Sequence, residues 1–500
     1  MVEEPADAEA DLSVRGARGG GLVLLGSGAS FAIQIASLLI LSRLLSPSDF
    51  GVVAMVTIFV ALGNLLRDFG LPLAGLQERS LSHQQASNLF WMSAVIAAVC
   101  SIVLVVSTPA LVTLFHEPRL TLIVPALAVA VFLGGLTSQL QVHLARRMQF
   151  TVLVASDVIG QLVALAAAVA LAIGGAGYWA LVAQSLTAAF LTLLFRWVAC
   201  RWMPTAPRRG HGAFRLLKTG ATYGFAQMLT FAQSNVGTLL IGAQLGATQL
   251  GYYNRAYQLL TAPAGRLLDP LTQVVVTTLN RAKAAQRDPD ELLFKIQFGV
   301  GTFIVWMFAV TAGTAPALIP LTLGDQWIPA VPIFQVLAAG GAVWVFNHVS
   351  YWAFIVKEKP AALLTYNFVS KPLAIASIYI GSHFGLIGVA WGYSAAMALS
   401  WPLNLLWLAR TAGLPARRFL ANGFRVLLAG AFAAATSAVT YSLLVQGPPL
   451  VTVAAGVLTG TAAMAAVLLA LPASRALFAD WIRLVRSSLL PRIKVGLPNA

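Results

Sequence analysis

The 500-residue sequence has few charged side chains and almost no cysteine. Asp, Glu, Lys and Arg together make up 10% of the residues, against about 25% in an ordinary soluble domain, and 58% are hydrophobic. The two cysteines, Cys100 and Cys200, stand in apolar runs without metal-binding spacing, which excludes a disulfide framework and favours small core residues. A water-soluble core of this length could not bury so much apolar surface, so we expect most of the chain to lie in lipid.

Motifs of bond-making chemistry are also missing. The six histidines show no HExxH spacing, and the sequence has no Walker motif. The tripeptide DFG occurs at 49–51 and 68–70, but no Gly-rich nucleotide loop or kinase-sized soluble domain accompanies it. We therefore predict that the protein is not an enzyme and uses no metal and no cofactor.

Long apolar runs fill the chain instead. A membrane-spanning helix needs about 20 mostly apolar residues, and about fourteen such runs can be marked. The first run is too long for a signal-peptide core and lacks a cleavage site, so we expect it to be retained as the first helix. The sequence predicts an all-α integral membrane protein with spans near 22–45, 50–76, 84–107, 119–143, 152–174, 177–199, 214–243, 252–279, 292–318, 328–355, 361–381, 385–409, 420–444 and 449–471.

The basic residues predict the orientation of these spans. Lys and Arg exceed Asp and Glu by 32 − 17 = 15. With the N-terminus inside, most basic residues fall in cytoplasmic segments, whereas the opposite side keeps only Arg43 and Arg119. Because positive residues are retained on the cytoplasmic side during insertion, we predict a bacterial cytoplasmic membrane protein with both termini inside. The charge then needs no nucleic-acid partner.

An internal repeat relates the two halves of the chain. LLSPSDFGVV at 44–53 matches QLGATQLGYY at 244–253 when the chain is shifted by 200 residues, and 157–182 falls over 367–392 at a shift of about 210. Chance similarity between apolar segments is the alternative explanation. Two six-helix halves with the same orientation would be related by an axis along the membrane normal. We predict a cytoplasmic tail at 1–20, an N-terminal lobe at 21–200, a basic cytoplasmic linker at 201–213, a C-terminal lobe at 214–410, an extra helix pair at 411–472 and a basic cytoplasmic tail at 473–500.

Charged residues inside the predicted spans are the candidate functional groups. Each costs roughly 2.5–3.5 kcal/mol at mid-bilayer and so needs a partner, water or an interface position. In LLRDFGLPLAG and GRLLDPLTQ, the repeat places Arg67 beside Arg266. The same shift places Asp68 beside Asp269, each with a proline close behind. We interpret these residues as gate ion pairs; self-neutralising pairs that snorkel to the cytoplasmic interface are the alternative.

Two further cations have no acidic residue within a helical turn in the sequence. Arg255 lies in GYYNRAYQLL, a turn inside the outer end of its helix, where snorkelling is an alternative to an anion-facing role. Lys371 precedes Pro372 and is predicted to face a cavity, whereas Asp157 is predicted to lie at the cytoplasmic interface. Isolated cations outnumber isolated anions, and phosphate suits a cationic cavity. Arg255 and Lys371 are therefore the candidate substrate-binding residues.

Several segments resemble a known family. SRLLSPSDFGVVAMV, LPLAGLQERSLSHQQASNLFWMS, LLIGAQLGATQLGYYNRAYQLLTAPAG and FGLIGVAWG are similar to the polysaccharide transporter branch of the MOP exporter superfamily, above all to Wzx-type lipopolysaccharide and exopolysaccharide flippases. The resemblance covers helices one to twelve. It implies the MOP flippase fold, with two six-helix lobes that move a polyprenyl-diphosphate-linked oligosaccharide outward by alternating access. Fourteen helices also resemble the lipid II flippases, in which a helix-eight arginine lines the cavity, and Arg255 is the matching position.

The sequence also departs from this family, which leaves other functions open. Gly237 and Ala243 stand where relatives often carry an acid in helix seven and a basic residue after LLIG, which weakens any ion site there. A multidrug cation antiporter would need isolated acids in its cavity, but cations prevail. A membrane-embedded polymerase or glycosyltransferase would need catalytic acids in a large outer loop, and the longest such loops offer Glu117 or Asp325. The predicted partners are the lipid-linked oligosaccharide, the bilayer, and a polysaccharide polymerase and export machinery.

Overall fold

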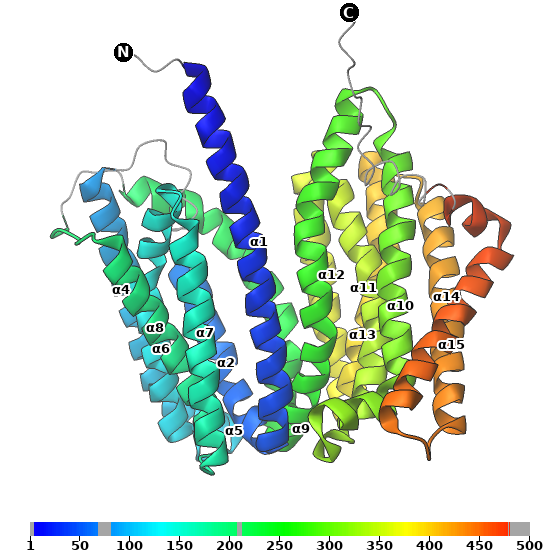
Figure 1. Cartoon of the computed structure of the whole chain (residues 1–500), viewed down its shortest axis with the longest axis horizontal. Coiled ribbons are helices and arrows are strands. Elements are labelled where there is room, and N and C mark those ends of the chain that lie inside the picture. The colour runs from blue at the N-terminus through cyan, green and yellow to red at the C-terminus, as the bar shows by residue number, and fades with distance from the viewer. Residues whose placement is uncertain (1–4, 69–81, 208–212, 479, 481–500) are drawn as a thin grey trace, which may run out of the picture. The chain divides into compact units, whose positions relative to one another are not determined.

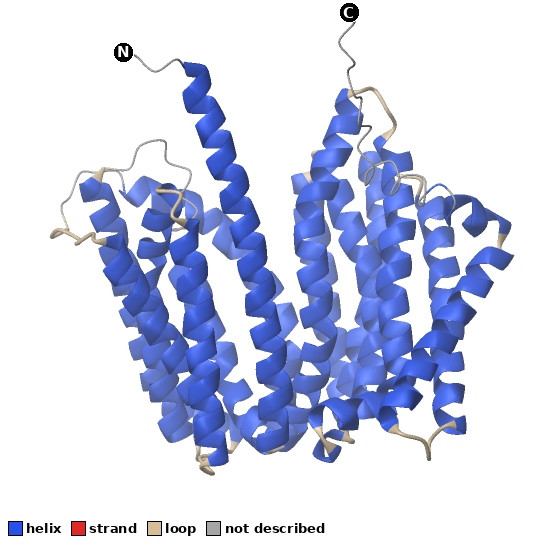
Figure 2. Ribbon diagram, viewed as in Figure 1, coloured by secondary structure: helices blue, strands red, loops and turns tan. Residues whose placement is uncertain are grey.

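The structure is a computed structural model that describes residues 5–68, 82–207, 213–478 and 480. These residues form helices and loops and no strand (Figure 2). The all-α prediction is confirmed. The helices, in chain order, are α1 (Pro5–Leu44), α2 (Pro47–Asp68), α4 (His83–Val106), α5 (Thr108–Phe115), α6 (Leu120–Arg146), α7 (Phe150–Ile173), α8 (Trp179–Cys200), α9 (Ala213–Ala284), α10 (Pro289–Leu323), the 3-10 helix η1 (Asp325–Trp327), α11 (Ala330–Val356), α12 (Pro360–Ser382), α13 (Gly385–Ala412), α14 (Ala416–Leu443) and α15 (Pro449–Ala470).

Twelve helices of the described chain are long and apolar enough to cross a membrane. The two other predicted spans, 214–243 and 252–279, both fall in α9, which has 72 residues. A straight helix of that length would be about 108 Å long, more than three times the hydrocarbon thickness of a bilayer. Gly246, with φ 81° and ψ 180°, breaks α9 into two segments, and glycine adopts this conformation without the strain of a side chain. The protein is thus a multi-pass membrane protein, and the twelve spans found in its described residues lie close to the predicted number of about fourteen.

The first helix begins earlier than the sequence indicated. The predicted tail at 1–20 is helical from Pro5 onward, and the apolar span within α1 is Gly21–Leu44. Proline suits the first turn of a helix, and the alanine and glutamate that follow it favour helix even where they are polar. Apolarity therefore marked the membrane span within α1 but not the start of the helix.

The chain forms two compact units, Met1–Asn254 and Arg255–Ala500. In the first unit α4 packs on α6, α7 packs on α1 and α8, and α6 also packs on α8. In the second unit α10 packs on α11, α14 and α15, while α13 packs on α11 and α12; Figure 1 shows α14 and α15 side by side. The boundary between the units falls within α9. The division predicted at 201–213 stays a prediction, and 208–212 and most of the predicted basic tail lie outside the described residues.

Small residues bring the C-terminal helix pair close to α10. A Cβ added to Gly313 of α10 would lie 2.5 Å from the backbone oxygen of Ala434 and from Cβ of Ser437 in α14. Gly456 of α15 would likewise meet the methyl group of Thr314 at 2.5 Å. Such contacts are the usual means of helix association in lipid, where burial of apolar surface supplies no driving force between helices.

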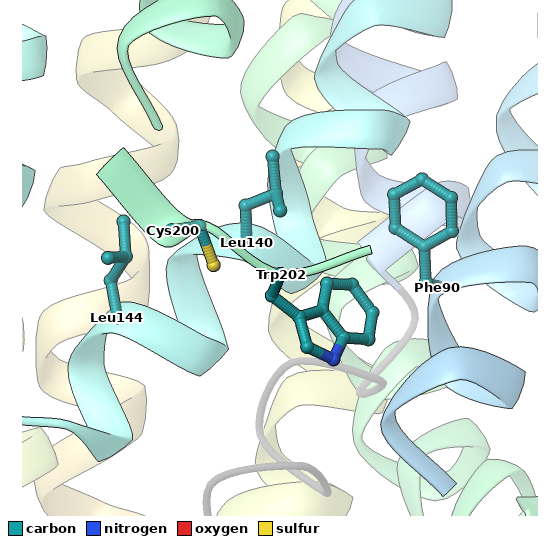
Figure 3. Packing of buried hydrophobic residues seen from close by; sticks show 5 residues of the cluster. All are labelled: Phe90, Leu140, Leu144, Cys200 and Trp202. Carbon is teal, nitrogen blue, oxygen red and sulfur yellow. The ribbon is translucent and has the colours of Figure 1, made fainter. Parts of the chain in front are cut away.

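A cluster of buried side chains lies at one end of the first unit. Phe90, Leu140, Leu144, Cys200 and Trp202 pack together where α4, α6 and the end of α8 meet (Figure 3). Cys200 is buried and forms no disulfide, as predicted for a small core residue. The indole of Trp202 also stacks on His143, with 5.4 Å between the ring centroids.

The LLSPSDFG motif begins α2 and ties it to a distant turn. The backbone N–H of Ser46 donates to Oδ2 of Asp49 at 3.0 Å, and the N–H of Asp49 donates to Oγ of Ser46 at 3.3 Å. This reciprocal pair satisfies N–H groups that a helix start leaves unpaired. The second carboxylate oxygen of Asp49 accepts the N–H of Tyr178, at 3.1 Å, before α8. One aspartate thus fixes both the start of α2 and the turn between α7 and α8.

The repeated glycines of the two matching motifs lie at one reciprocal contact within the first unit. A Cβ added to Gly51 would overlap the carbonyl oxygen of Ala247, and a Cβ added to Gly251 would overlap that of Pro47. The four positions differ by 200 residues in pairs, so each motif supplies one glycine and one carbonyl. The even spacing of the two motifs therefore reflects a backbone-to-backbone contact that only glycine permits on either side.

An ion pair beside this contact gives a stability that depends on pH. Nε and Nη2 of Arg119 donate to the two carboxylate oxygens of Glu117, each at 2.8 Å, and Nη2 also donates to Oγ of Ser48 at 3.0 Å. The hydrogen bonds from Arg119 lower the pKa of Glu117 from its ordinary value. Because the pKa is lower in the folded state, this stabilisation is present above the unfolded pKa of about 4.3 and is lost as pH falls through the folded pKa.

We predict that Glu117→Gln lowers the melting temperature of the protein in detergent at neutral pH and has less effect below about pH 4. The measurement is a series of melting curves from pH 7 downward for the wild type and the variant. A difference in melting temperature that stays constant over the series would contradict the prediction.

Candidate functional site

A polar cavity of about 470 Å³ lies inside the first unit, between α2, α6, α7 and α8. Among the described residues, its wall combines the cation of Arg67 with hydroxyl and amide groups, although all four helices are apolar enough to span a membrane. The polar lining residues are Arg67, Thr137, Ser138, Gln141, Gln161 and Thr192. Hydroxyl and amide groups both donate and accept hydrogen bonds, so this wall can hold an anionic group and its hydroxyl-bearing neighbours.

Arg67 is positioned by its own helix and by a glycine pair. Nη1 of Arg67 donates to Oδ1 of Asn64, one turn earlier in α2, at 2.9 Å. A Cβ added to Gly134 of α6 would overlap Nη1 of Arg67, and one added to Gly135 would lie 3.4 Å from its Cδ. The two glycines therefore leave the space that the guanidinium fills.

A second arginine is buried next to this cavity. Nη2 of Arg196 in α8 donates to Oδ1 of Asp157 in α7 at 2.7 Å, and its Nε donates to Oγ of Ser156 at 3.1 Å. Its Nη1 donates at 3.0 Å to Oε1 of Gln141, which also lines the cavity. Arg196 stands one turn before Cys200, at the end of α8, and is 4% exposed. At this position of α8, the side chain of Arg196 points toward the neighbouring helices α6 and α7.

Asp157 is the partly exposed member of this ion pair, with 42% of its side chain exposed against 5% for Arg196. Asp157→Asn would leave the buried guanidinium without a counter-charge. We expect a loss of about 2 kcal/mol in the free energy of unfolding, below the roughly 3–5 kcal/mol of a fully buried pair. Thermal melting in detergent measures this loss. Glu358→Gln removes the exposed pair between Lys283 and Glu358 and serves as the control, for which we expect no measurable change.

The predicted substrate-binding cations lie in the second unit. Arg255 is half-buried in α9, and its Nη1 donates to Oε1 of Gln258 at 2.9 Å. Lys371 is half-buried in α12, next to the buried Ser370. Their assignment to a diphosphate stays a prediction.

The predicted gate residues are only partly described. Arg67 lines the cavity of the first unit, while the side chain of Asp68 lies outside the described part of the chain. Arg266 and Asp269 are exposed on α9 in the second unit, and the carboxylate of Asp269 acts electrostatically on His348 of α11. The gate role of these residues stays a prediction.

The spacing of polar residues in the sequence is a further signal for the cavity. Polar residues recur at helical spacing in three of the four helices: Ser138 and Gln141 in α6, Asp157 and Gln161 in α7, and Thr192 and Arg196 in α8. Residues three or four apart share one face of a helix. Three such polar faces in otherwise apolar helices indicate a common polar interior.

A further cavity, of about 240 Å³, lies in the second unit at the end of α10. Its wall is largely proline and aliphatic, and Asp325 is its charged residue. Its described lining contains no cation, so it is a weaker candidate for an anionic cargo than the cavity around Arg67.

The fold and the cavity together define a class of protein. Ionisable groups inside spanning helices mark substrate paths, because a polar solute can meet them without contacting lipid. Two similar sets of helices around such sites are a common architecture of transporters. The chain is thus a multi-pass membrane protein with a polar site among its spanning helices.

The comparisons with known proteins agree with this class. Residues 40–332, more than half of the chain, match the family described as polysaccharide biosynthesis protein. The chain belongs to this family, which confirms the resemblance seen in the sequence. It is 23% identical over 371 residues to the teichuronic acid biosynthesis protein TuaB of Bacillus subtilis (strain 168), covering 72% of this chain and 76% of that protein. It is 24% identical over 393 residues to the succinoglycan biosynthesis transport protein ExoT of Rhizobium meliloti (strain 1021), covering 74% and 78%.

Solved structures with the same fold are lipid flippases and drug transporters. Lipid II flippase MurJ, in its inward closed conformation, aligns with a TM-score of 0.70 at 12% identity, covering 92% of this chain and 100% of that chain. An inward-facing multidrug resistance MATE family transporter of the MOP superfamily aligns with a TM-score of 0.58 at 14% identity, covering 79% and 95%. At these identities the likeness establishes the MOP fold and leaves the cargo to the residues of this chain.

Proposed function

We propose that the protein moves a polyprenyl-diphosphate-linked oligosaccharide from the cytoplasmic to the outer leaflet of the bacterial cytoplasmic membrane by alternating access. The observation that carries this proposal is the polar cavity around Arg67, set inside apolar spanning helices. Its volume of about 470 Å³ lies within the range of about 300–1,000 Å³ of small-molecule sites. The polyprenyl chain stays in the bilayer, so the protein has to shield only the head group.

The chemistry of the cavity wall fits such a head group. A guanidinium binds phosphate oxygens through charge-assisted hydrogen bonds. Gln141, Gln161 and Thr192 offer the mixed donors and acceptors that sugar hydroxyls need. Arg255 and Lys371 would contact the diphosphate from the second unit, and Arg67 with Asp68 and Arg266 with Asp269 would gate the cytoplasmic side.

The same-fold drug transporter makes a multidrug cation antiporter the second candidate. An organic cation would need an acidic or aromatic wall, whereas the charged group lining the cavity is an arginine. This observation favours the anionic cargo. A polysaccharide polymerase and the export machinery would then act on the translocated product at the outer face.

Mass spectrometry of membrane lipids from a strain lacking the protein tests the proposal. We expect a complete polyprenyl-diphosphate oligosaccharide to accumulate relative to the parent strain, and its mass would identify the cargo. Truncated oligosaccharides would instead indicate an enzyme of assembly. An unchanged lipid pool together with new sensitivity to cationic drugs would support the antiporter.

A further inference from the structure

The cavity of about 240 Å³ in the second unit has a wall unlike that of the cavity around Arg67. It lies where the end of α10, the 3-10 helix η1 and the turn between α14 and α15 meet. Proline, alanine, leucine and valine form most of its described lining, and the polar side chains of that lining are Asp325, Tyr441 and Thr452. A cavity of this volume holds several water molecules and can therefore admit a ligand the size of one sugar ring.

Two tight turns hold the polar residues of this cavity in place. Gly324, with φ 104°, ends α10 directly before Asp325. Trp327 follows in η1 and is fully buried, so Asp325 stands between two fixed points of the backbone. On the opposite wall, Oγ1 of Thr452 donates to the carbonyl oxygen of Leu444 at 3.0 Å, which joins the start of α15 to the end of α14. The cavity is thus formed by rigid parts of the second unit.

The wall offers hydrogen-bond acceptors rather than cations. The carboxylate of Asp325, which is exposed, can accept several hydrogen bonds, and the hydroxyl of Thr452 keeps its lone pairs for a ligand. Pro320 has no N–H, so the carbonyl group of Pro316, one turn earlier in α10, lacks its helical donor. The described lining contains no lysine, arginine or histidine. Such a wall suits a ligand that carries hydroxyl donors and disfavours phosphate.

The apolar part of the wall narrows the choice of ligand further. A metal ion such as Ca²⁺ takes about six to eight oxygen ligands, whereas most of this lining is carbon. A sugar ring has hydroxyl groups around its rim and C–H groups on its faces. Tyr441 supplies an aromatic surface with a polar tip, and Pro320 and Pro449 supply apolar surface. The combination of one carboxylate, one phenol and apolar walls therefore fits a sugar ring.

The charges of α10 and α14 indicate which side of the membrane the cavity faces. Lys295 lies in the second turn of α10, and Arg417, Arg418 and Arg425 lie in the first ten residues of α14. The cavity lies at the other end of both helices. Because basic residues are retained on the cytoplasmic side during insertion, the sequence predicts that the cavity lies at the outer face.

We propose that this cavity is an outer sugar site that binds one neutral sugar residue of the transported oligosaccharide, an inference that rests on the proposed flippase function. Asp325 accepts hydrogen bonds from the hydroxyl groups of the sugar, while Tyr441 and the prolines contact its C–H face. The carboxylate repels the diphosphate, so the site recognises the sugar part of the head group alone. Binding at the outer face favours the translocated cargo over its return.

Saturation-transfer NMR on the purified protein, in a detergent without a sugar head group, tests the site. The probes are glucose, galactose, mannose, rhamnose and N-acetylglucosamine, with glucuronate and ethanolamine as the anionic and cationic comparisons. We expect saturation transfer to at least one neutral sugar, and an affinity about tenfold or more weaker in Asp325→Ala, because a hydrogen bond to a charged group is lost. Transfer to glucuronate or ethanolamine alone, or to none of the probes, would overturn the proposal.

A second variant fills the cavity from an exposed position. Val445 lines the cavity and is 57% exposed, so Val445→Trp places an indole there without disturbing the core. Val439→Trp is the matched control, because Val439 belongs to the same helix and is 56% exposed. We expect sugar binding to be lost in Val445→Trp and kept in Val439→Trp. Equal binding by the wild type, Asp325→Ala and Val445→Trp would place the sugar elsewhere and overturn the site.

The binding measurement needs no transport, so the sugar site and the flippase function can fail separately. If the two variants lose sugar binding but the wild type flips no lipid in vesicles, the flippase function fails while the sugar site stands. If the wild type flips the lipid-linked oligosaccharide but binds none of the neutral sugars, the sugar site fails while the flippase function stands.

Discussion

Arg67→Gln is expected to reduce the rate of lipid-linked oligosaccharide transport by about tenfold to hundredfold while the protein stays folded. Arg67 is the cation in the wall of the polar cavity of the first unit. A hydrogen bond to a charged group contributes about 1.5–3 kcal/mol, and glutamine keeps hydrogen-bonding capacity but loses the charge. The measurement is transport in vesicles with equal amounts of reconstituted protein. Arg417→Gln, at an exposed arginine in the first turn of α14, is the matched control.

A second variant displaces the same guanidinium without replacing the arginine. Gly134→Ala places a methyl group where Nη1 of Arg67 lies, so the guanidinium has to move out of its present position. We expect transport to fall in this variant as well, because position as well as charge matters for binding a phosphate. Gly28→Ala is the control, since a Cβ there meets nothing within 4 Å. Normal transport by both Arg67→Gln and Gly134→Ala would remove Arg67 from the account.

Gly51→Ala and Gly251→Ala are each expected to lower the free energy of unfolding by about 3 kcal/mol or more. In both variants the new methyl group overlaps a backbone carbonyl, which cannot rotate away as a side chain can. Gly265→Ala is the control with the opposite sign: it lies in α9 with open space around it, and alanine favours helix by about 1 kcal/mol. Thermal melting in detergent compares the three variants with the wild type.

The reciprocal geometry adds a sharper expectation for the double variant. Either methyl group alone already separates the segments around Gly51 and Gly251, so the second should cost much less than the first. We expect the loss in Gly51→Ala/Gly251→Ala to be clearly smaller than the two single losses together, as for residues that share one contact. Strictly additive losses would show that the two glycines act independently.

The sequence predicted the membrane class and the approximate number of spans, because these depend on the length of apolar runs. It also singled out both glycine motifs, but the contact between Gly51 and Ala247 joins residues far apart in the chain and could not be inferred from spacing. Arg196 shows a different limit. It pairs with Asp157 of α7, and a contact between two helices could not be inferred from the sequence of either one.

The candidate site was predicted less completely than the fold. The sequence predicted a functional role for Arg67 because a charge in an apolar helix needs a partner, water or an interface position. The structure places Arg67 in a polar cavity. His348 carried no such signal, because neutral histidine is tolerated in apolar sequence and Thr272, which lies within hydrogen-bond distance of its ring, belongs to another helix. A charged residue in an apolar helix stands out in the sequence because its burial is unfavourable. A site formed by neutral polar residues from two helices can be recognised only in the structure.

The most direct test of the flippase is the sidedness of its cargo in reconstituted vesicles. A polyprenyl-diphosphate oligosaccharide is placed in the inner leaflet only, and an enzyme or lectin added outside reports how much of it reaches the outer leaflet. The account predicts that the wild type exposes the oligosaccharide much faster than protein-free vesicles do, and that Arg67→Gln slows this exposure. Exposure at the protein-free rate, or at an equal rate in the wild type and Arg67→Gln, would contradict it.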